Sequence, residues 1–332
     1  MPLNRTKRPT TLISETPKNP IGLPLYPETK GFLELVPEVD PDKVGVDAFR
    51  KGFRELSQML PKEPVDHIED VRIPGSQYEI PARVYSPTMG ERSGGVLYFH
   101  GGGFVIGDVE SYDPFCRTLA NASRSVVISV DYRLAPEHKF PAAVNDAFDS
   151  VTWVLKNAGR FGITEGIAVA GDSSGGNLAA VSALRCRDGG VNLRAQVLVF
   201  PFVSFDPVSR SSIEYADNFF LTAKQGAWFA AQYLSRPEDA LNPMFSPALA
   251  GNFSGLPPSL VITAEYDPLR DQGEAYADML AKAGVMVASI RVRGATHGFI
   301  ALPGIGGDTC SMIGGYLRKT FHYQVPESHP TP

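Results

Sequence analysis

The sequence predicts an α/β fold in which a mostly parallel central sheet is flanked by helices. From about residue 75 onward, short apolar runs alternate with segments that show the apolar spacing of helices. Several runs are apolar at nearly every position, as expected for strands that are buried on both faces of a parallel sheet. The predicted strands are residues 79–85, 95–99, 125–130, 167–170, 196–200, 260–264 and 287–292, and the predicted helices are 145–156, 176–187, 272–283 and 309–320.

Length and composition agree with a large folded domain and exclude several classes of protein. The 332 residues are 43% hydrophobic and 20% charged, which lies in the globular range. The formal net charge of −5 lacks the basic surplus that nucleic-acid binding requires, so nucleic acid is not an expected partner. No run of 18 apolar residues is present, so stable membrane insertion is not expected. The oligomeric state stays open, and a homodimer is compatible with the sequence.

The cysteines and the first residues predict a cytoplasmic protein without a metal site. Cys116, Cys186 and Cys310 are far apart, with no CxxC pair and no histidine at metal-ligand spacing. They are therefore expected to be free thiols in a reducing compartment. The first twenty residues carry basic side chains but no apolar run that would make a secretory signal.

Two regions do not follow the strand–helix alternation, and both are predicted to form a helical cap. In residues 1–74, five apolar side chains are spaced three or four residues apart, so they share one face of a helix. These are Val46, Phe49, Phe53, Leu56 and Leu60. Residues 206–241 are again helical in pattern and rich in aromatic side chains. We expect both regions to pack together over the carboxyl ends of the strands, while residues 75–205 and 242–332 form the α/β domain.

Ser173 is the predicted nucleophile, within the segment GDSSG at residues 171–175. An apolar strand precedes this G-x-S-x-G pattern and a helix-forming run follows it, which is the context of a nucleophile elbow. Gly171 and Gly175 leave room for the sharp turn, because a Cβ there would collide with the neighbouring strand or helix. The alternative, an ordinary glycine-rich turn between a strand and a helix, is disfavoured by this context.

Backbone donors for an oxyanion hole are predicted in the segment His100-Gly101-Gly102-Gly103, directly after an apolar strand. Acyl transfer creates a negatively charged oxygen that preorganised N–H groups stabilise, and an HGGG segment is the known companion of the elbow. The predicted donors are the N–H groups of Gly102, Gly103 and Ser174. A flexible glycine loop or a phosphate cradle is the alternative, but neither GxxxxGKS nor GxGxxG is present at this segment.

His297 is the predicted base. In this fold class the acid and the base follow the nucleophile in the order Ser, Asp or Glu, His, and three histidines follow Ser173. His322 and His329 lie in a polar C-terminal tail, whereas His297 follows the predicted strand 287–292.

The predicted acid is Asp267, just beyond the predicted strand 260–264. Glu265 and Asp271 lie in the same segment and are the alternatives. Asp267 sits in the turn before a proline, where a carboxylate can point into the site. Asp271 is better placed as an acid in the first turn of the next helix.

With these residues in place, the chain resembles the hormone-sensitive-lipase-like esterases, the bacterial family IV of the α/β-hydrolase superfamily. The matching blocks are FHGGGF (99–104), DYRLAPEHKFPAA (131–143), GDSSGGNLAA (171–180), and DPLRD (267–271) with HGF (297–299). The resemblance implies the α/β-hydrolase fold with a helical cap, and it implies neither a metal nor an organic cofactor.

The resemblance also assigns roles to single residues. It implies Ser173 as nucleophile, Asp267 as triad acid and His297 as base. It implies structural roles for His100, Tyr132, Arg133 and Glu137. The common family elbow is GDSAG, so Ser174 replaces an alanine here while keeping the N–H group.

The expected activity is hydrolysis of carboxylic esters with short- to medium-chain acyl groups, through an acyl-enzyme, so the expected partner is a small-molecule ester. A cap made of two pieces predicts a small enclosed pocket. Its candidate lining residues are Phe104, Phe219, Phe220 and Leu221. Core packing of the cap is the alternative role for the aromatic ones. The competing functions are an amide or lactone hydrolase, a lipase with the same triad, or a receptor like those for gibberellin, which lack the catalytic histidine.

Overall fold

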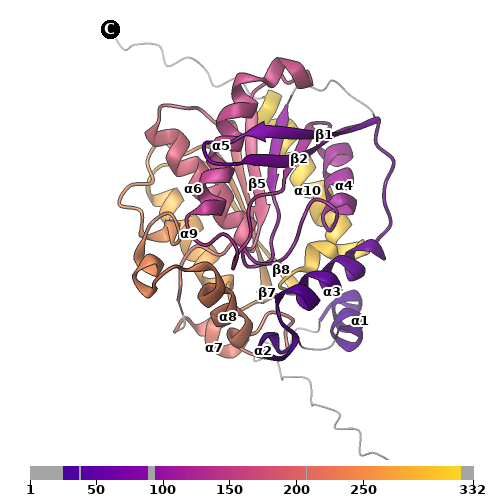
Figure 1. Cartoon of the computed structure of the whole chain (residues 1–332), viewed down its shortest axis with the longest axis vertical. Coiled ribbons are helices and arrows are strands. Elements are labelled where there is room, and N and C mark those ends of the chain that lie inside the picture. The colour runs from indigo at the N-terminus through magenta and orange to yellow at the C-terminus, as the bar shows by residue number, and fades with distance from the viewer. Residues whose placement is uncertain (1–24, 37–38, 89–93, 207, 323–332) are drawn as a thin grey trace, which may run out of the picture.

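The computed structural model describes residues 25–36, 39–88, 94–206 and 208–322, and it confirms the predicted α/β fold (Figure 1). One sheet of eight strands lies at its centre, in the order β1-β2-β4-β3-β5-β6-β7-β8. The strands are β1 (His67–Pro74), β2 (Glu79–Ser86), β3 (Gly95–Phe99), β4 (Val126–Val130), β5 (Ile167–Asp172), β6 (Ala195–Val199), β7 (Ser259–Tyr266) and β8 (Val287–Thr296). β2 is antiparallel to both neighbours and every other pair is parallel, so β5, β7 and β8 end at the same edge of the sheet.

The seven predicted strands are all present, with ends that differ by a few residues, but the sequence pattern missed β1. Exposed and buried side chains alternate near the end of β1, because it lies at the edge of the sheet and one face meets solvent. Such a strand contains no continuous apolar run, so its sequence does not stand out. The predicted division placed residues 67–74 in the cap. This is wrong, because they form β1 and belong to the sheet.

Helices cover both faces of the sheet (Figure 1). One face carries α5 (Ala142–Lys156), α6 (Ser174–Asp188) and α9 (Arg270–Lys282), and the other carries α4 (Asp113–Ser123) and α10 (Pro303–His322). Four of these match the predicted helices, whereas α4 was not predicted, because its buried stripe consists mostly of small residues such as Cys116, Ala120 and Ser123. Within the described residues, no helix combines the length and the apolar composition needed to cross a membrane.

The remaining helices gather at one end of the molecule (Figure 1). They are α1 (Pro27–Leu35), α2 (Pro41–Val44), α3 (Val46–Gln58), α7 (Arg210–Glu214) and α8 (Ala223–Tyr233). α3 is the helix predicted from the apolar spacing. The helical reading of residues 206–241 is wrong for the middle of that region, because α7 ends before an irregular segment in which Asn218 and Phe220 have φ of 69° and 76°.

The segment before β1 and the segment between β6 and β7 contact each other, although they are far apart in sequence. The rings of Phe49 on α3 and Phe229 on α8 stack with centroids 5.8 Å apart. Gln225 on α8 donates from its amide nitrogen to the carbonyl of Val39 over 2.9 Å, and Lys224 pairs with Asp40 at 2.6 Å. Apolar packing and polar contacts thus join the two segments.

Candidate active site

Ser173 occupies a sharp turn between β5 and α6. It is the single residue between the end of the strand and the first residue of the helix, and its φ of 53° lies in the left-handed region that a non-glycine residue adopts only under strain. The neighbouring chain leaves no room for side chains, because a Cβ at Gly175 would overlap the carbonyl of Phe99 and one at Gly171 would overlap that of Gly175. This is the strand–turn–helix geometry that the sequence pattern predicted.

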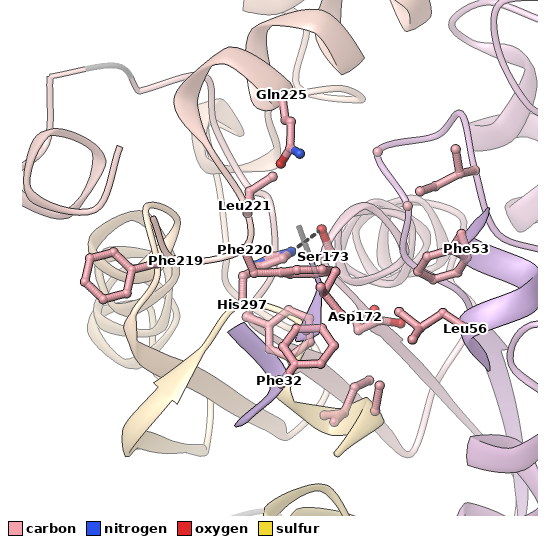
Figure 2. Close-up of a pocket in the computed structure, with 18 of the residues that line it drawn as sticks. Phe32, Phe53, Leu56, Asp172, Ser173, Phe219, Phe220, Leu221, Gln225 and His297 are labelled. Carbon is pink, nitrogen blue, oxygen red and sulfur yellow. Dashed lines mark hydrogen bonds between the residues drawn. The ribbon is translucent and has the colours of Figure 1, made fainter. Parts of the chain in front are cut away.

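The structure brings Ser173, His297 and Asp267 into one hydrogen-bonded series. Figure 2 shows the contact between His297 and Ser173. Nε2 of His297 lies 2.9 Å from Oγ of Ser173, and Nδ1 lies 2.8 Å from Oδ2 of Asp267. Oδ1 of Asp267 accepts from the N–H of Leu269 over 2.8 Å, so both carboxylate oxygens are held. The three residues follow β5, β8 and β7, whose carboxyl ends meet at one edge of the sheet.

The other candidates for acid and base lie elsewhere. Asp271 lies in the first turn of α9, where it accepts from the N–H of Ser211 over 2.8 Å. Glu265 accepts from the N–H of Gly294 over 2.8 Å. His322 is the last residue of α10, and His329 lies outside the described residues.

The glycine loop after β3 presents backbone N–H groups beside Ser173. Gly102 has a φ of 113°, and a Cβ there would overlap the carbonyl of Ile106. Its own carbonyl accepts from the N–H groups of Val105 and Ile106 over 3.0 and 2.9 Å, which fixes the loop. Within the described part of the chain, the N–H groups of Gly102, Gly103 and Ser174 donate to no protein acceptor. They are therefore available to a negatively charged oxygen.

Asp172 ties this glycine loop to the elbow, a role that the sequence reasoning missed. Its carboxylate accepts from the hydroxyls of Tyr98 and Tyr112 over 2.6 and 2.9 Å and from the N–H of Gly101 over 3.0 Å. Burial raises the pKa of Asp172, and burial also raises the pKa of both tyrosines far above their usual value, so they remain donors. The sequence did contain a signal for this role, because Asp172 is an acidic residue between an apolar strand and Ser173.

His100 is buried under the loop, in agreement with the structural role that the resemblance implied. Its ring stacks on Tyr132 with centroids 4.3 Å apart, and the hydroxyl of Tyr132 donates to its carbonyl over 2.6 Å. Nδ1 lies 2.7 Å from the carbonyl oxygen of Gly101 and must therefore carry the proton. Desolvation lowers the pKa of His100 to about 4.

The cavity above Ser173 is larger than the sequence reasoning predicted. Its volume is about 1890 Å³, whereas ordinary small-molecule pockets hold roughly 300–1,000 Å³. The prediction of a small enclosed pocket is therefore wrong. Among the described residues, no three His, Cys, Asp or Glu side chains are arranged to hold a metal ion.

The four predicted lining residues differ in their position. Phe220 and Leu221 lie beside His297 and Ser173 (Figure 2). The ring of Phe220 also packs close to Gly298, where an added Cβ would come within 2.8 Å of its Cε1.

Phe219 points away from Ser173 in Figure 2 and stacks on Tyr266 with centroids 5.2 Å apart. Phe104 stacks on Tyr233 at 4.0 Å. Both line the cavity but are nearly fully buried against these rings, so core packing dominates for these two.

Comparisons with known proteins agree with this geometry. The sequence profile of the alpha/beta hydrolase fold family matches residues 96–301. An arylesterase of Saccharolobus solfataricus is 42% identical over 305 residues, which cover 90% of this chain and 100% of the relative. An ethyl acetate hydrolase of Pseudomonas putida is 36% identical over 298 residues, covering 85% of this chain and 93% of the relative.

A solved structure is similar over nearly the same length. The hyperthermophilic esterase of the archaeon Pyrobaculum calidifontis shares 47% identity and superposes with a TM-score of 0.85, covering 90% of this chain and 99% of its own. The resemblance predicted from the four sequence blocks is thereby confirmed. Because the family profile spans more than half of the sequence, the chain belongs to the alpha/beta hydrolase fold family.

Proposed function

We propose that this chain is a serine carboxylesterase that hydrolyses esters of short- to medium-chain acids. The observation that carries the proposal is the hydrogen-bonded series from Asp267 through His297 to Ser173, beside backbone N–H groups that no protein acceptor occupies within the described residues. The names of the arylesterase and ethyl acetate hydrolase relatives support ester substrates.

The proposed mechanism has two steps with Ser173 as the nucleophile. Oγ of Ser173 attacks the ester carbonyl carbon while Nε2 of His297 accepts its proton, and the protonated imidazole then gives that proton to the leaving alcohol oxygen. Water repeats the sequence on the acyl-enzyme and releases the acid. Asp267 keeps the proton of the resting imidazole on Nδ1 and stabilises the imidazolium that forms.

The oxyanion of each tetrahedral intermediate is assigned to the N–H groups of Gly102, Gly103 and Ser174. Ser174 is the first residue of α6, so the positive end of the helix dipole adds to its donor. Each donor is expected to lower the barrier by about 3–4 kcal/mol. Asp172 supports the hole indirectly, because it holds Gly101 in place.

The segment before β1 and residues 206–241 are proposed as a cap that bounds the cavity. α1, α3 and α8 supply lining residues, whereas the proposed triad and oxyanion groups all come from the α/β domain. The acyl chain is assigned to the side of the cavity that ends against Phe104, Phe202 and Phe245, whose rings lie 5.0 to 6.5 Å apart.

The competing functions differ from ester hydrolysis in what they require. A non-catalytic receptor has no need of the contact between His297 and Ser173, which is 2.9 Å long here. Hydrolysis of amides needs dedicated protonation of a poor leaving group, and no group in the cavity besides His297 is assigned to that task. Lactone hydrolysis and lipase activity use the same triad, so a substrate panel decides between them and simple esters.

The test compares wild type with Ser173→Ala, His297→Ala and the double variant on p-nitrophenyl butyrate. Each single variant should lower kcat by about 10⁴- to 10⁶-fold, and the double variant should be little worse, because triad members act as a unit. Ser204→Ala, which changes a serine of the cavity lining outside the triad, is the matched control. A fluorophosphonate should label Ser173, as read by mass spectrometry. Near wild-type turnover in either single variant, or labelling of another serine, would contradict the proposal.

A further inference from the structure

Helix α7 is anchored at both ends on the segment that carries Asp267. We call this segment, residues 267–271, the acid loop. Ser211, in the first turn of α7, is fully buried, and its N–H donates to Oδ2 of Asp271 over 2.8 Å. Tyr215, directly after α7, accepts with its hydroxyl from the guanidinium of Arg270 over 3.2 Å. Since α7 belongs to the proposed cap, one part of the cap contacts the proposed triad acid's own loop.

The hydroxyl of Ser211 makes two further hydrogen bonds with the acid loop. Its Oγ accepts from the N–H of Asp271 over 3.1 Å and donates to the carbonyl oxygen of Pro268 over 3.0 Å. A hydroxyl has a single proton, and a carbonyl can only accept, so this proton points at Pro268. Pro268 is buried, and a buried carbonyl needs a donor.

The Pro268–Leu269 peptide is the central peptide of a tight turn. The N–H of Arg270 donates to the carbonyl of Asp267 over 3.1 Å, and Leu269 has φ −88° and ψ −2°, the values of a type I turn. Such a turn gives the C=O and the N–H of its central peptide no partner of their own. Here the C=O accepts from Ser211, and the N–H of Leu269 donates to Oδ1 of Asp267 over 2.8 Å. Because a peptide is planar, the direction of its C=O sets the direction of its N–H.

The hydrogen bonds continue from this peptide to the proposed nucleophile. Oδ2 of Asp267 lies 2.8 Å from Nδ1 of His297, whose Nε2 lies 2.9 Å from Oγ of Ser173. Asp267 is completely buried, so solvent does not replace these partners. Hydrogen bonds in series polarise one another, so a donor to the Pro268 carbonyl strengthens the N–H of Leu269 as a donor.

We propose that Ser211 is a positioning residue for ester hydrolysis: through the Pro268–Leu269 peptide, its hydroxyl fixes the carboxylate of Asp267 in the orientation that His297 requires. The inference rests on the proposed triad. Ser211 itself is not among the residues that line the cavity, so it acts on the reaction through Asp267 and not by touching the ester. Its loss should therefore lower kcat and leave KM nearly unchanged.

The position of Ser211 also connects the cavity wall to the acid. Ser212, the next residue of α7, lines the cavity, as do Pro268 and Leu269. Because Ser211 and Ser212 are neighbours on one short helix, the wall and the donor to Pro268 move together. The carboxylate of Asp267 is thus held in place when α7 is docked on the acid loop.

The test compares Ser211→Ala with Ser150→Ala as the matched control. Ser211→Ala removes the hydroxyl and keeps the N–H that donates to Asp271. Ser150 is also a fully buried helical serine, and its Oγ donates to the carbonyl of Asp146 within α5 over 2.7 Å. Both variants lose one buried hydrogen bond to a carbonyl, so thermal unfolding should show similar losses of stability. On p-nitrophenyl butyrate, Ser211→Ala should lower kcat about tenfold and change KM by less than about twofold, whereas Ser150→Ala should keep both.

A double-mutant cycle shows whether Ser211 acts through Asp267. In an Asp267→Asn background there is no carboxylate to position, so adding Ser211→Ala should change kcat by less than about twofold. A role in folding alone would instead give the same loss in both backgrounds.

The outcomes separate this inference from the proposed function. An unchanged kcat in Ser211→Ala, an equal loss in Ser150→Ala, or a full loss in the Asp267→Asn background overturns the inference and leaves the proposed function intact. Wild type without ester hydrolysis, or turnover that survives Ser173→Ala, removes the function and the inference with it. If Ser211→Ala does not fold, Ser211→Cys fills the same space with a weaker donor. It should show the same selective loss of kcat, and an unchanged kcat there overturns the inference.

Discussion

The guanidinium of Arg50 donates to both carboxylate oxygens of Glu137, each over 2.8 Å. The same group donates from Nε to the carbonyl of Val105 over 2.8 Å and from Nη2 to that of Ala135 over 2.9 Å. Arg50 therefore connects α3 to Val105, just after the glycine loop, and to the segment of Ala135 and Glu137. The N-terminal segment is fixed to the α/β domain beside the predicted oxyanion donors.

Replacing Arg50 by methionine should lower both stability and turnover. The change leaves two backbone carbonyls and one carboxylate without this donor, which we expect to cost about 1–3 kcal/mol of unfolding free energy. Because Val105 also donates to the carbonyl of Gly102, kcat on p-nitrophenyl butyrate should fall more than KM changes. The control is Lys51→Met, since Lys51 is exposed and pairs with Glu55 at 3.8 Å on the same helix. Equal behaviour of the two variants would contradict the coupling of α3 to the loop.

Asp267→Asn should abolish most of the activity, whereas Asp271→Asn should act mainly on stability. An asparagine at 267 favours the wrong imidazole tautomer, and the expected loss in kcat is roughly 10⁴-fold. Asp271 instead accepts from the N–H of Ser211 and pairs with Arg270, away from His297. Initial rates on p-nitrophenyl butyrate and thermal unfolding of both variants measure the difference. An exchange of these phenotypes would show that the acid is misassigned.

Buried His100 should make the folded state less stable in acid. Its pKa in the folded state is lowered to about 4 from a usual value of 6.5, so between these values the unfolded chain binds more protons. Unfolding free energy therefore falls as pH drops through this window, and His100 contributes a loss of about 2 kcal/mol between pH 7 and pH 5. Asp131 acts in the opposite direction, because desolvation and Asp108 raise its pKa to about 6.

The contribution of His100 is isolated by comparing wild type with His100→Asn in urea unfolding at pH 7 and pH 5. Between pH 7 and pH 5, the unfolding free energy of His100→Asn should fall by about 2 kcal/mol less than that of wild type. Asp131 is present in both proteins, so its contribution cancels in the comparison. His67→Asn changes an exposed histidine and serves as the control. A pH dependence that is the same in wild type and His100→Asn would show that His100 remains neutral or charged in both states.

The sequence predicted those parts of the fold in which the type of each residue directly reflects its burial or its turn. β4 and β6 are buried at every position, so each reads as a continuous apolar run. The elbow at Ser173 is also visible in the sequence, because its tight turn requires glycine at 171 and 175. A Cβ at Gly171 would overlap the carbonyl of Gly175, and a Cβ at Gly175 would overlap that of Phe99 on the neighbouring strand. The order of Asp267 and His297 along the chain then left few candidates.

The features that the sequence did not predict depend on contacts between distant segments. The irregular turn at Asn218 and Phe220 forms where Phe219 stacks on Tyr266, at the end of β7. A helical pattern in residues 206–241 contains no information about that partner. The size of the cavity depends in the same way on how residues of α1, α3, α8 and α10 come together around Ser173, which no local pattern reveals.

The dependence of kcat/KM on acyl-chain length tests the side of the cavity that is assigned to the acyl group of the ester. Each added CH₂ should contribute about 0.8 kcal/mol while it becomes buried, so kcat/KM should rise over the first few carbons of a p-nitrophenyl ester series. The chain then meets Phe104 and Phe245, which are 4% and 1% exposed and cannot move without disturbing the core. We therefore expect an optimum between butyrate and octanoate, even though the whole cavity is large, because the side assigned to the acyl chain ends at these rings. Phe245→Ala should move the optimum to longer chains, while Phe219→Ala, on Tyr266, should reduce stability and leave the optimum unchanged. A steady rise through palmitate with activation at an oil–water interface would identify a lipase, and would show that the aromatic cluster does not end the acyl side.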